Sequence, residues 1–336
     1  MSDWHIYQGH GHRHDGIDRL PAPPPWRAMS RQGTGPGSGS VEDDRYRYRA
    51  AVYQSDPGTV DAVNAALLLR RPLLVTGRPG TGKSTLAHQV AHELGLGPVL
   101  RWAITSRSTL KDGLYIYDAI GRLQEASRRA AALSARRDGA PPPPGEERSD
   151  IGSYLRLGPL GTALLPAQRP RVLLIDEVDK SDLDLPNDLL HVFEDGDFEI
   201  PELVRLTREP TIDVLTSDGR TAPITEGRVQ CTVFPLVILT SNGEREFPAA
   251  FLRRCVSLRL PEPDMDKLAR IVEAHLGRDG AERGREIIEI FLRNRAEGLV
   301  STDQLLNAIY LATGNGTPEG REELVRLLLR PLGPGT

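Results

Sequence analysis

Residues 77–84 combine the amino-acid types that proteins use to hold a phosphate group. The segment runs Gly-Arg-Pro-Gly-Thr-Gly-Lys-Ser, between the apolar run Leu73–Thr76 and a stretch with a helical pattern. Glycines let backbone N–H groups approach phosphate oxygens without a Cβ clash, and the start of the next helix adds unpaired N–H groups and a positive dipole end. We therefore predict a phosphate-binding loop.

The predicted ligand of this loop is ATP, bound together with Mg²⁺. Lys83 would neutralise the β- and γ-phosphates, and Ser84 would offer its hydroxyl to the metal ion. The residues expected to contact the nucleotide are consecutive: Gly77, Arg78, Pro79, Gly80, Thr81, Gly82, Lys83, Ser84 and Thr85. An ordinary glycine-rich turn is the alternative, and the strand before the loop and the helix after it argue against that alternative.

Two adjacent carboxylates, Asp176 and Glu177, follow the apolar run 172–175. A buried parallel strand delivers the residues at its carboxyl end to the ligand crevice of an open α/β sheet. We expect Asp176 to hold Mg²⁺, directly or through water, and Glu177 to polarise the attacking water as a general base. Two carboxylates at a strand end with no site attached are the alternative.

Further polar residues follow the apolar run 236–239. The amide of Asn242 is placed to orient a water molecule against the γ-phosphate, although Ser-Asn-Gly is also a good turn sequence. Arg253 and Arg254 lie eleven and twelve residues beyond Asn242 and cannot easily reach the site of their own chain. We predict that they act as arginine fingers in a neighbouring subunit. A surface pair, or a pair bound in salt bridges, is the alternative.

The elements that must position these residues alternate between strands and helices. Short, mainly apolar runs separated by helical patterns indicate a parallel sheet that is covered on both faces. The predicted fold is therefore an α/β P-loop NTPase with a parallel sheet covered by helices, plus a small C-terminal helical lid domain. The predicted strands are 73–76, 99–104, 171–175 and 236–239, and the predicted lid helices are 264–276, 281–296, 302–312 and 319–330.

We predict three parts of the chain from composition and pattern. Residues 1–48 form a disordered tail rich in proline, glycine and histidine, because such segments bury too little apolar surface to fold. Residues 49–260 form the ATPase core, and residues 261–336 form the lid. The core carries an exposed insertion at 125–150 and a hairpin insertion at 200–234, where Ser-Asp-Gly supplies a hairpin turn signal.

The composition excludes several classes of protein. The net charge of −4 argues against wholesale binding to nucleic-acid backbone. No run approaches the roughly 18 apolar residues that a membrane helix needs, and the start of the chain lacks the pattern of a signal peptide. Only two cysteines are present, Cys231 and Cys255, and both are expected to be buried thiols. We expect a cytoplasmic protein that has no contact with membranes. The histidines at 10, 12 and 14 are expected to bind no metal, or to bind it adventitiously.

In this order, the motifs resemble those of AAA+ ATPases, and within them the MoxR-like, dynein-related group. Gly77–Ser84 is similar to Walker A, and Leu173–Glu177 is similar to Walker B. Leu239–Asn242 looks like the sensor-1 strand end, and Pro248–Cys255 looks like the arginine-finger segment. The resemblance covers about residues 50–330.

The resemblance implies ring-shaped oligomers, usually hexamers, with ATP at the subunit interfaces. It implies remodelling of a partner protein, often one with a von Willebrand A domain. Thr105 fits the polar residue that contacts the Walker B glutamate in such proteins. One position departs from the pattern, since Asp303 stands where many relatives have a sensor-2 arginine. Arg293 and Arg295 are candidates to supply that arginine from elsewhere.

The predicted function is therefore that of an ATP-hydrolysing motor that remodels a partner protein. The Asp303 departure leaves an alternative, a slow-hydrolysing ATP-binding switch or scaffold in a multi-component system. A motor acting on nucleic acid is less favoured, because the chain is acidic and contains no recognisable DNA-binding module.

Overall fold

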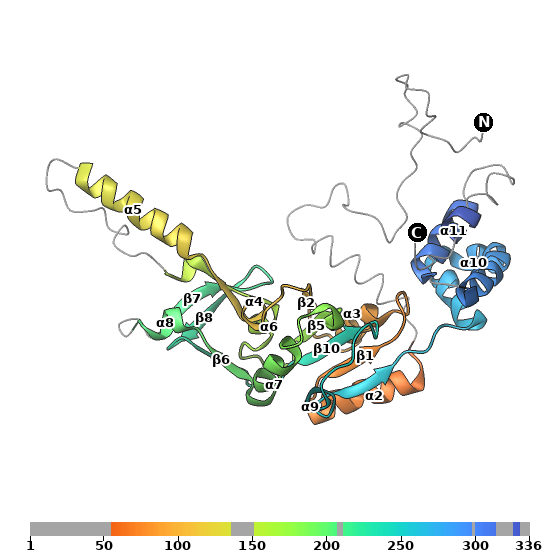
Figure 1. Cartoon of the computed structure of the whole chain (residues 1–336), viewed down its shortest axis with the longest axis horizontal. Helices are drawn as coiled ribbons and strands as arrows, with labels where there is room; N and C mark the ends of the chain where they lie inside the picture. The colour runs from red at the N-terminus through yellow and green to blue at the C-terminus, as the bar shows by residue number, and fades with distance from the viewer. Residues whose placement is uncertain (1–54, 136–150, 207–210, 298–299, 314–324, 330–336) are drawn as a thin grey trace, which may run out of the picture. The chain divides into compact units, whose positions relative to one another are not determined.

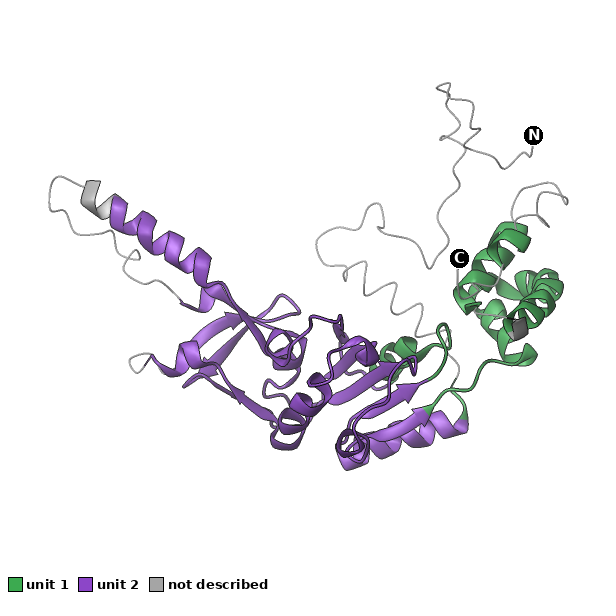
Figure 2. Cartoon of the chain, in the orientation of Figure 1, with its two compact units in different colours: residues 1–56, 77–93, 259–336 green, residues 57–76, 94–258 purple. Residues whose placement is uncertain are grey.

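The computed structural model describes residues 55–135, 151–206, 211–297, 300–313 and 325–329 (Figure 1). The predicted tail at 1–48 lies outside these ranges, and so does the 136–150 part of the predicted insertion. The chain divides into two compact units, coloured separately in Figure 2. Unit 1 contains residues 1–56, 77–93 and 259–336, and unit 2 contains residues 57–76 and 94–258.

A five-stranded sheet forms the centre of unit 2. Its strand order is β11-β1-β10-β5-β2, and β1, β10, β5 and β2 pair in parallel. Every residue of β5 and β10 is buried, which explains their continuous apolar sequences. The predicted parallel sheet is thus confirmed, with strand ends shifted by at most two residues. The bounds are β1 Leu73–Thr76, β2 Leu100–Ala103, β5 Val172–Asp176, β10 Leu236–Ser241 and β11 Val256–Arg259.

Helices and short turns connect these strands in unit 2. In α7 the buried residues Leu185, Leu189, Val192 and Phe193 recur at helical spacing, and Gly196 ends the helix in the left-handed conformation with φ 66°. Figure 1 shows α5 extending away from both sheets of the unit. The bounds are α2 Pro57–Leu69, α4 Leu110–Leu114, α5 Ala119–Ala135, α6 Pro159–Ala163, α7 Leu185–Asp195, α8 Pro201–Val204 and α9 Ala249–Leu252, with 3₁₀ turns η3 Ile151–Tyr154 and η4 Val178–Lys180.

A second, six-stranded sheet of unit 2 was only partly predicted. Strands β7 and β8 form an antiparallel hairpin around the Ser-Asp-Gly turn, within the region where the sequence indicates one. The remaining strands extend this hairpin into the order β3-β4-β7-β8-β9-β6. Four of the strands have three residues each, too short for an alternating pattern to appear in the sequence. The bounds are β3 Tyr115–Tyr117, β4 Leu155–Leu157, β6 Asp197–Glu199, β7 Thr211–Leu215, β8 Thr221–Thr225 and β9 Arg228–Gln230.

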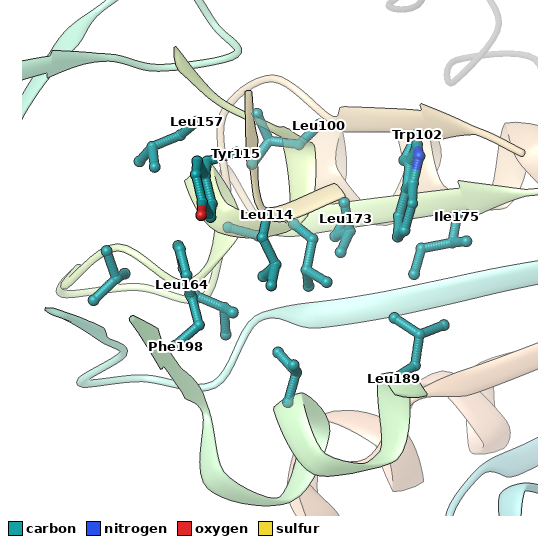
Figure 3. Close-up of a cluster of buried hydrophobic side chains, with 14 of the residues drawn as sticks. Leu100, Trp102, Leu114, Tyr115, Leu157, Leu164, Leu173, Ile175, Leu189 and Phe198 are labelled. Carbon is teal, nitrogen blue, oxygen red and sulfur yellow. The ribbon is translucent and has the colours of Figure 1, made fainter. Parts of the chain in front are cut away.

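One cluster of buried side chains joins the two sheets, as Figure 3 shows. Trp102 and Ile175 come from the five-stranded sheet, whereas Leu157 and Phe198 come from the six-stranded sheet. Backbone segments also approach closely here, because a Cβ atom at Gly161 would overlap the carbonyl oxygen of Leu114. The second sheet is therefore built into the core that supports the first.

Unit 1 contains α3 Lys83–Glu93 and a helical C-terminal region. Helix α10, Met265–Glu297, is interrupted at Gly277 with φ 76°, so it corresponds to the two helices predicted at 264–276 and 281–296. Helix α11 spans Thr302–Thr313, and residues 325–328 are also helical. These helices bury their own apolar cluster, which includes Leu268, Val272, Ile288, Phe291, Leu305 and Ile309. Among the described helices, none combines the length and apolar character needed to cross a bilayer.

Replacing Ile212 with alanine tests whether the six-stranded sheet contributes to the stability of unit 2. Ile212 is 5% exposed on β7, whereas Leu215 on the same strand is 40% exposed. We expect Ile212→Ala to lower the free energy of unfolding by about 2–5 kcal/mol, because it leaves a cavity. The matched control Leu215→Ala should lower it by less than about 1 kcal/mol. Urea denaturation of both variants measures this, and equal losses would contradict the packing.

Candidate functional site

The glycine loop of unit 1 closes around the ammonium group of Lys83. The Nζ atom donates hydrogen bonds to the carbonyl oxygens of Gly77 at 2.7 Å and Arg78 at 2.9 Å. Lys83 is 7% exposed and is the first residue of α3. Gly80 and Gly82 have φ of 80° and 88°, a conformation that favours glycine. The loop thus holds a positive charge at the start of a helix, which is the arrangement that binds phosphate.

The same loop lies against the lid helices of unit 1. A Cβ atom at Gly80 would lie 2.9 Å from the backbone nitrogen of Thr302, at the start of α11. The carboxylate of Glu262 forms ion pairs with Nε of Arg78 at 2.9 Å and with Nε of Arg295 at 3.2 Å. A glycine is therefore needed at position 80, and one carboxylate connects the loop with helix α10.

The two carboxylates of the predicted site follow β5 in unit 2. Asp176 is 6% exposed, and its Oδ2 accepts a hydrogen bond from Arg101 at 2.6 Å. Its Oδ1 accepts one from the hydroxyl of Thr240 at 2.7 Å. The same hydroxyl accepts the backbone N–H of Glu177 at 2.9 Å. Thr240, which is 1% exposed, therefore fixes both acidic residues to the neighbouring strand β10.

Glu177 has a strained backbone at the position predicted for the general base. Its φ and ψ are 61° and 49°, in the left-handed region that costs a residue other than glycine about 1–3 kcal/mol. Its carboxylate accepts a hydrogen bond from Lys180 at 2.7 Å and is 44% exposed. That hydrogen bond raises the pKa of Lys180 above its ordinary value. Lys180 and Glu177 thus form an ion pair within one turn, through Oε2 of the carboxylate.

Thr105 was predicted to contact Glu177, and the structure pairs each of them with another residue. The hydroxyl of Thr105 lies 3.2 Å from that of Ser108, and its backbone N–H donates to the same Ser108 oxygen. Glu177 instead bonds to Lys180, which stands three residues later in the same turn. The predicted Thr105–Glu177 contact is wrong for this conformation, because each side chain has a closer partner in its own turn.

Asn242 begins the loop that follows β10. Its side-chain Nδ2 donates to Glu244 at 3.4 Å, and its backbone N–H donates to Asp179 at 2.8 Å. Strands β10 and β5 run side by side in parallel, with Leu239 opposite Ile175. The structure therefore brings Asp176, Glu177 and Asn242 to the same edge of the sheet. Thr76, the residue bonded to Gly77, lies opposite Ser241 of β10 at this edge.

The two predicted arginine fingers have different surroundings. Arg254 forms an ion pair with Glu194 of α7 and also donates to the carbonyl oxygen of Ala250 at 3.3 Å. The side chain of Arg253 is exposed, and it has no ion-pair partner among the described residues. The backbone carbonyl of Arg253 accepts a hydrogen bond from Arg71 at 3.3 Å. Among the described contacts, neither guanidinium bonds to Asp176 or Glu177.

The candidates for a sensor-2 arginine also differ. Asp303 lies exposed in the first turn of α11. Arg295 is bound to Glu262 and donates to the carbonyl oxygen of Pro263 at 2.8 Å. Arg293 is exposed on α10. Arg295 is thus already engaged within the lid.

A family profile described as AAA domain (dynein-related subfamily) matches residues 72–255. The chain belongs to this family. The match begins just before β1 and ends just after Arg254, so it includes the glycine loop, both carboxylates and Asn242. An AAA+ domain binds nucleotide, and the family generally hydrolyses ATP. A search of the curated proteins gives no match.

Sequence reasoning overlooked Thr240 and Arg101, the two residues that hold Asp176. Thr240 was visible only as part of Thr-Ser-Asn at a strand end, and Arg101 only as a polar residue in an apolar strand. Their partners lie 64 and 75 residues away along the chain. Pairing in the sheet creates these contacts, and no local pattern records them.

Replacing Thr240 tests how Asp176 is held. Thr240→Val keeps the shape of the side chain and removes its hydroxyl, which leaves a buried carboxylate oxygen and a backbone N–H without that partner. We expect a loss of about 3 kcal/mol in the free energy of unfolding, since each unpaired group costs about 1–3 kcal/mol. The control Thr240→Ser keeps the hydroxyl and should lose about 1 kcal/mol. Chemical denaturation measures both, and a valine variant as stable as the serine variant would contradict this assignment.

Proposed function

We propose that this AAA+ chain hydrolyses ATP, with Glu177 activating the water. The single observation that supports this most strongly is the strained left-handed backbone of Glu177 at the carboxyl end of β5. Strained backbone persists only where the surrounding structure determines it, and it concentrates at functional sites. Thr240 provides part of this constraint, because its hydroxyl accepts the backbone N–H of Glu177 and donates to Asp176.

The glycine loop supports the binding half of this proposal. Its glycines and the first turn of α3 present backbone donors, and Lys83 supplies a charge for the β- and γ-phosphates. The proposed contact residues are Gly77, Arg78, Pro79, Gly80, Thr81, Gly82, Lys83, Ser84 and Thr85.

Mg²⁺ suits the oxygen donors proposed for it. Ser84 would offer a hydroxyl and Asp176 a carboxylate, and Mg²⁺ prefers a few such protein oxygens together with substrate phosphates and water. The ion would neutralise charge on the phosphates when bound. Asp176 would have to exchange its contact with Arg101 for this role, because Arg101 donates a hydrogen bond to its Oδ2 at 2.6 Å.

In the proposed reaction, Glu177 accepts the proton of a water molecule whose oxygen bonds to the γ-phosphorus. The bond between that phosphorus and the bridging oxygen breaks, and the bridging oxygen keeps the electron pair as ADP leaves. Asn242, in the loop beside Glu177, orients the water through its amide. Lys83 stabilises the charge on the phosphate oxygens.

Arg253 and Arg254 are proposed to complete the site of a neighbouring copy of the chain. Among the described contacts, neither bonds to Asp176 or Glu177, and an arginine supplied by a neighbour stabilises the charge that develops on the transferred phosphoryl group. This requires a ring of copies, for which six is the proposed number from the resemblance to MoxR-like proteins.

The ring is proposed to remodel a partner protein, and a protein with a von Willebrand A domain is one proposed partner. We propose a cytoplasmic location.

A second candidate function is a switch that binds ATP and hydrolyses it slowly. Two observations favour it: Asp303 stands exposed at the start of α11, and Arg295 is bound to Glu262. Slow turnover by assembled wild-type protein would support the switch over the motor.

Glu177→Gln tests the proposed base. The amide cannot accept a proton, so we expect turnover to fall by at least about 100-fold while ATP affinity changes little. Phosphate release and the binding of a fluorescent ATP analogue measure the two effects. The matched control is Glu226→Gln, because Glu226 also has a left-handed backbone, with φ 54°, but lies in the turn between β8 and β9. Wild-type turnover in Glu177→Gln would show that the base is assigned wrongly.

The arginine fingers are tested by mixing two inactive proteins. Arg253→Ala/Arg254→Ala has an intact base, and Glu177→Gln has intact arginines. We expect each alone to lose at least about 100-fold in turnover. Mixed rings should recover measurable activity, because an intact base then faces intact arginines. Arg220→Ala, which alters an arginine that is 72% exposed in the hairpin turn, is the control for loss of charge. Co-assembly without recovery would contradict action between copies.

A further inference from the structure

A buried carboxylate that the proposed reaction does not use lies two residues beyond Glu177. Asp179 is 4% exposed, and its Oδ2 accepts the backbone N–H groups of Asn242 at 2.8 Å and Glu244 at 3.2 Å. The N–H of Gly243, between them, donates to the hydroxyl of Ser241 at 3.0 Å. Three successive backbone donors after β10 are therefore held by side-chain oxygens, two of them by Asp179.

Other hydrogen bonds tie the same two segments together. We call residues 177–181 the carboxylate turn and residues 242–245 the amide loop. Arg245 of the amide loop donates to the carbonyl oxygen of Ser181 at 2.6 Å, at the end of the carboxylate turn. At its beginning, Glu177 donates its N–H to Thr240, just before the amide loop. Asp179 thus lies in the middle of the connection, and its partner Asn242 is the residue proposed to orient water.

We propose that Asp179 is a positioning residue that holds Asn242 in register with Glu177. A hydrogen bond to an ionised acceptor is about twice as strong as a neutral one, and one oxygen accepting two backbone donors fixes both the place and the direction of the loop. The inference rests on the proposed function, since it concerns the placing of the water-orienting amide against the base.

The hydrogen bonds of the Asp179 carboxylate favour this role over one in stability alone. A buried carboxylate carries a desolvation penalty that only good hydrogen bonds offset. The second oxygen of Asp179, Oδ1, is buried and has no hydrogen-bond partner among the described residues. Every hydrogen bond that its carboxylate makes among the described residues goes to the backbone of the amide loop. This favours the placing of that loop as its role.

A double-mutant cycle on the full chain tests the proposal. The variants are Asp179→Ala, Asn242→Ala and their combination, with kcat and KM for ATP measured by phosphate release. We expect Asp179→Ala to lower kcat at least tenfold and to change KM less than twofold, because nucleotide binding does not involve Asp179. In the Asn242→Ala background, Asp179→Ala should lower kcat less than twofold further, since its effect acts through Asn242.

Two further variants separate placing from folding. Asp179→Asn retains one oxygen that can accept both N–H groups, so it should recover part of the lost kcat and serves in the cycle if the alanine variant fails to fold. Asp182→Ala removes an exposed carboxylate just beyond the carboxylate turn, and among the described residues its Oδ1 accepts the N–H of Leu183 alone. This control should keep wild-type kcat.

The outcomes distinguish the inference from the proposed function. No ATP turnover by the wild-type protein contradicts the proposed function itself. If the wild type turns over ATP but the kcat losses of the two single variants multiply in the double variant, the role of Asp179 is overturned and hydrolysis stands. A raised KM with unchanged kcat in Asp179→Ala has the same consequence. Wild-type kcat in Asn242→Ala overturns the role of Asn242 and this inference together.

Discussion

The parallel pairing of β5 with β10 is the constraint on which the candidate site depends. Because both strands run in the same direction, their carboxyl ends meet at one edge of the sheet, and each ends in polar residues. Thr240 then connects the strands through Asp176 and Glu177, and Asp179 connects the turns beyond them. The apolar cluster shared by the two sheets includes Ile175 of β5 and Leu239 of β10. The six-stranded sheet, which was only partly predicted, therefore supports this pairing without supplying a residue to the site.

The motifs of this domain contain groups whose burial or backbone conformation is unfavourable. Glu177 has a left-handed backbone, Asp176 and Asp179 are buried carboxylates, and Lys83 is a buried cation in the other unit. The energetic cost of each group is offset by hydrogen bonds to backbone or hydroxyl groups. Stability alone does not call for such groups, since apolar residues would fill the same space with less penalty. Their concentration at the motifs of an AAA+ domain agrees with the proposed chemistry on a nucleotide.

Local patterns predicted the parts of the structure that depend on local chemistry. β1 was predicted to the residue, and β5 and β10 within two residues, because a strand buried on both faces must be apolar throughout. Three-residue strands such as β3 and β6 are too short to show a pattern of this kind in the sequence. The partners of Asp176, and the hydrogen bonds of Asp179, depend on strand pairing and on side-chain rotamers. The wrong Thr105–Glu177 contact has the same cause, because a resemblance carries residue types and not the rotamer that each adopts.

The central claim is that water attacks the γ-phosphate of ATP at this site. Incubating the wild-type protein with Mg²⁺ and ATP in ¹⁸O-labelled water, followed by mass spectrometry of the products, tests it most directly. The account predicts ADP together with an equal amount of phosphate that carries at least one ¹⁸O atom. ATP that binds with high affinity and is recovered unchanged and unlabelled would contradict it.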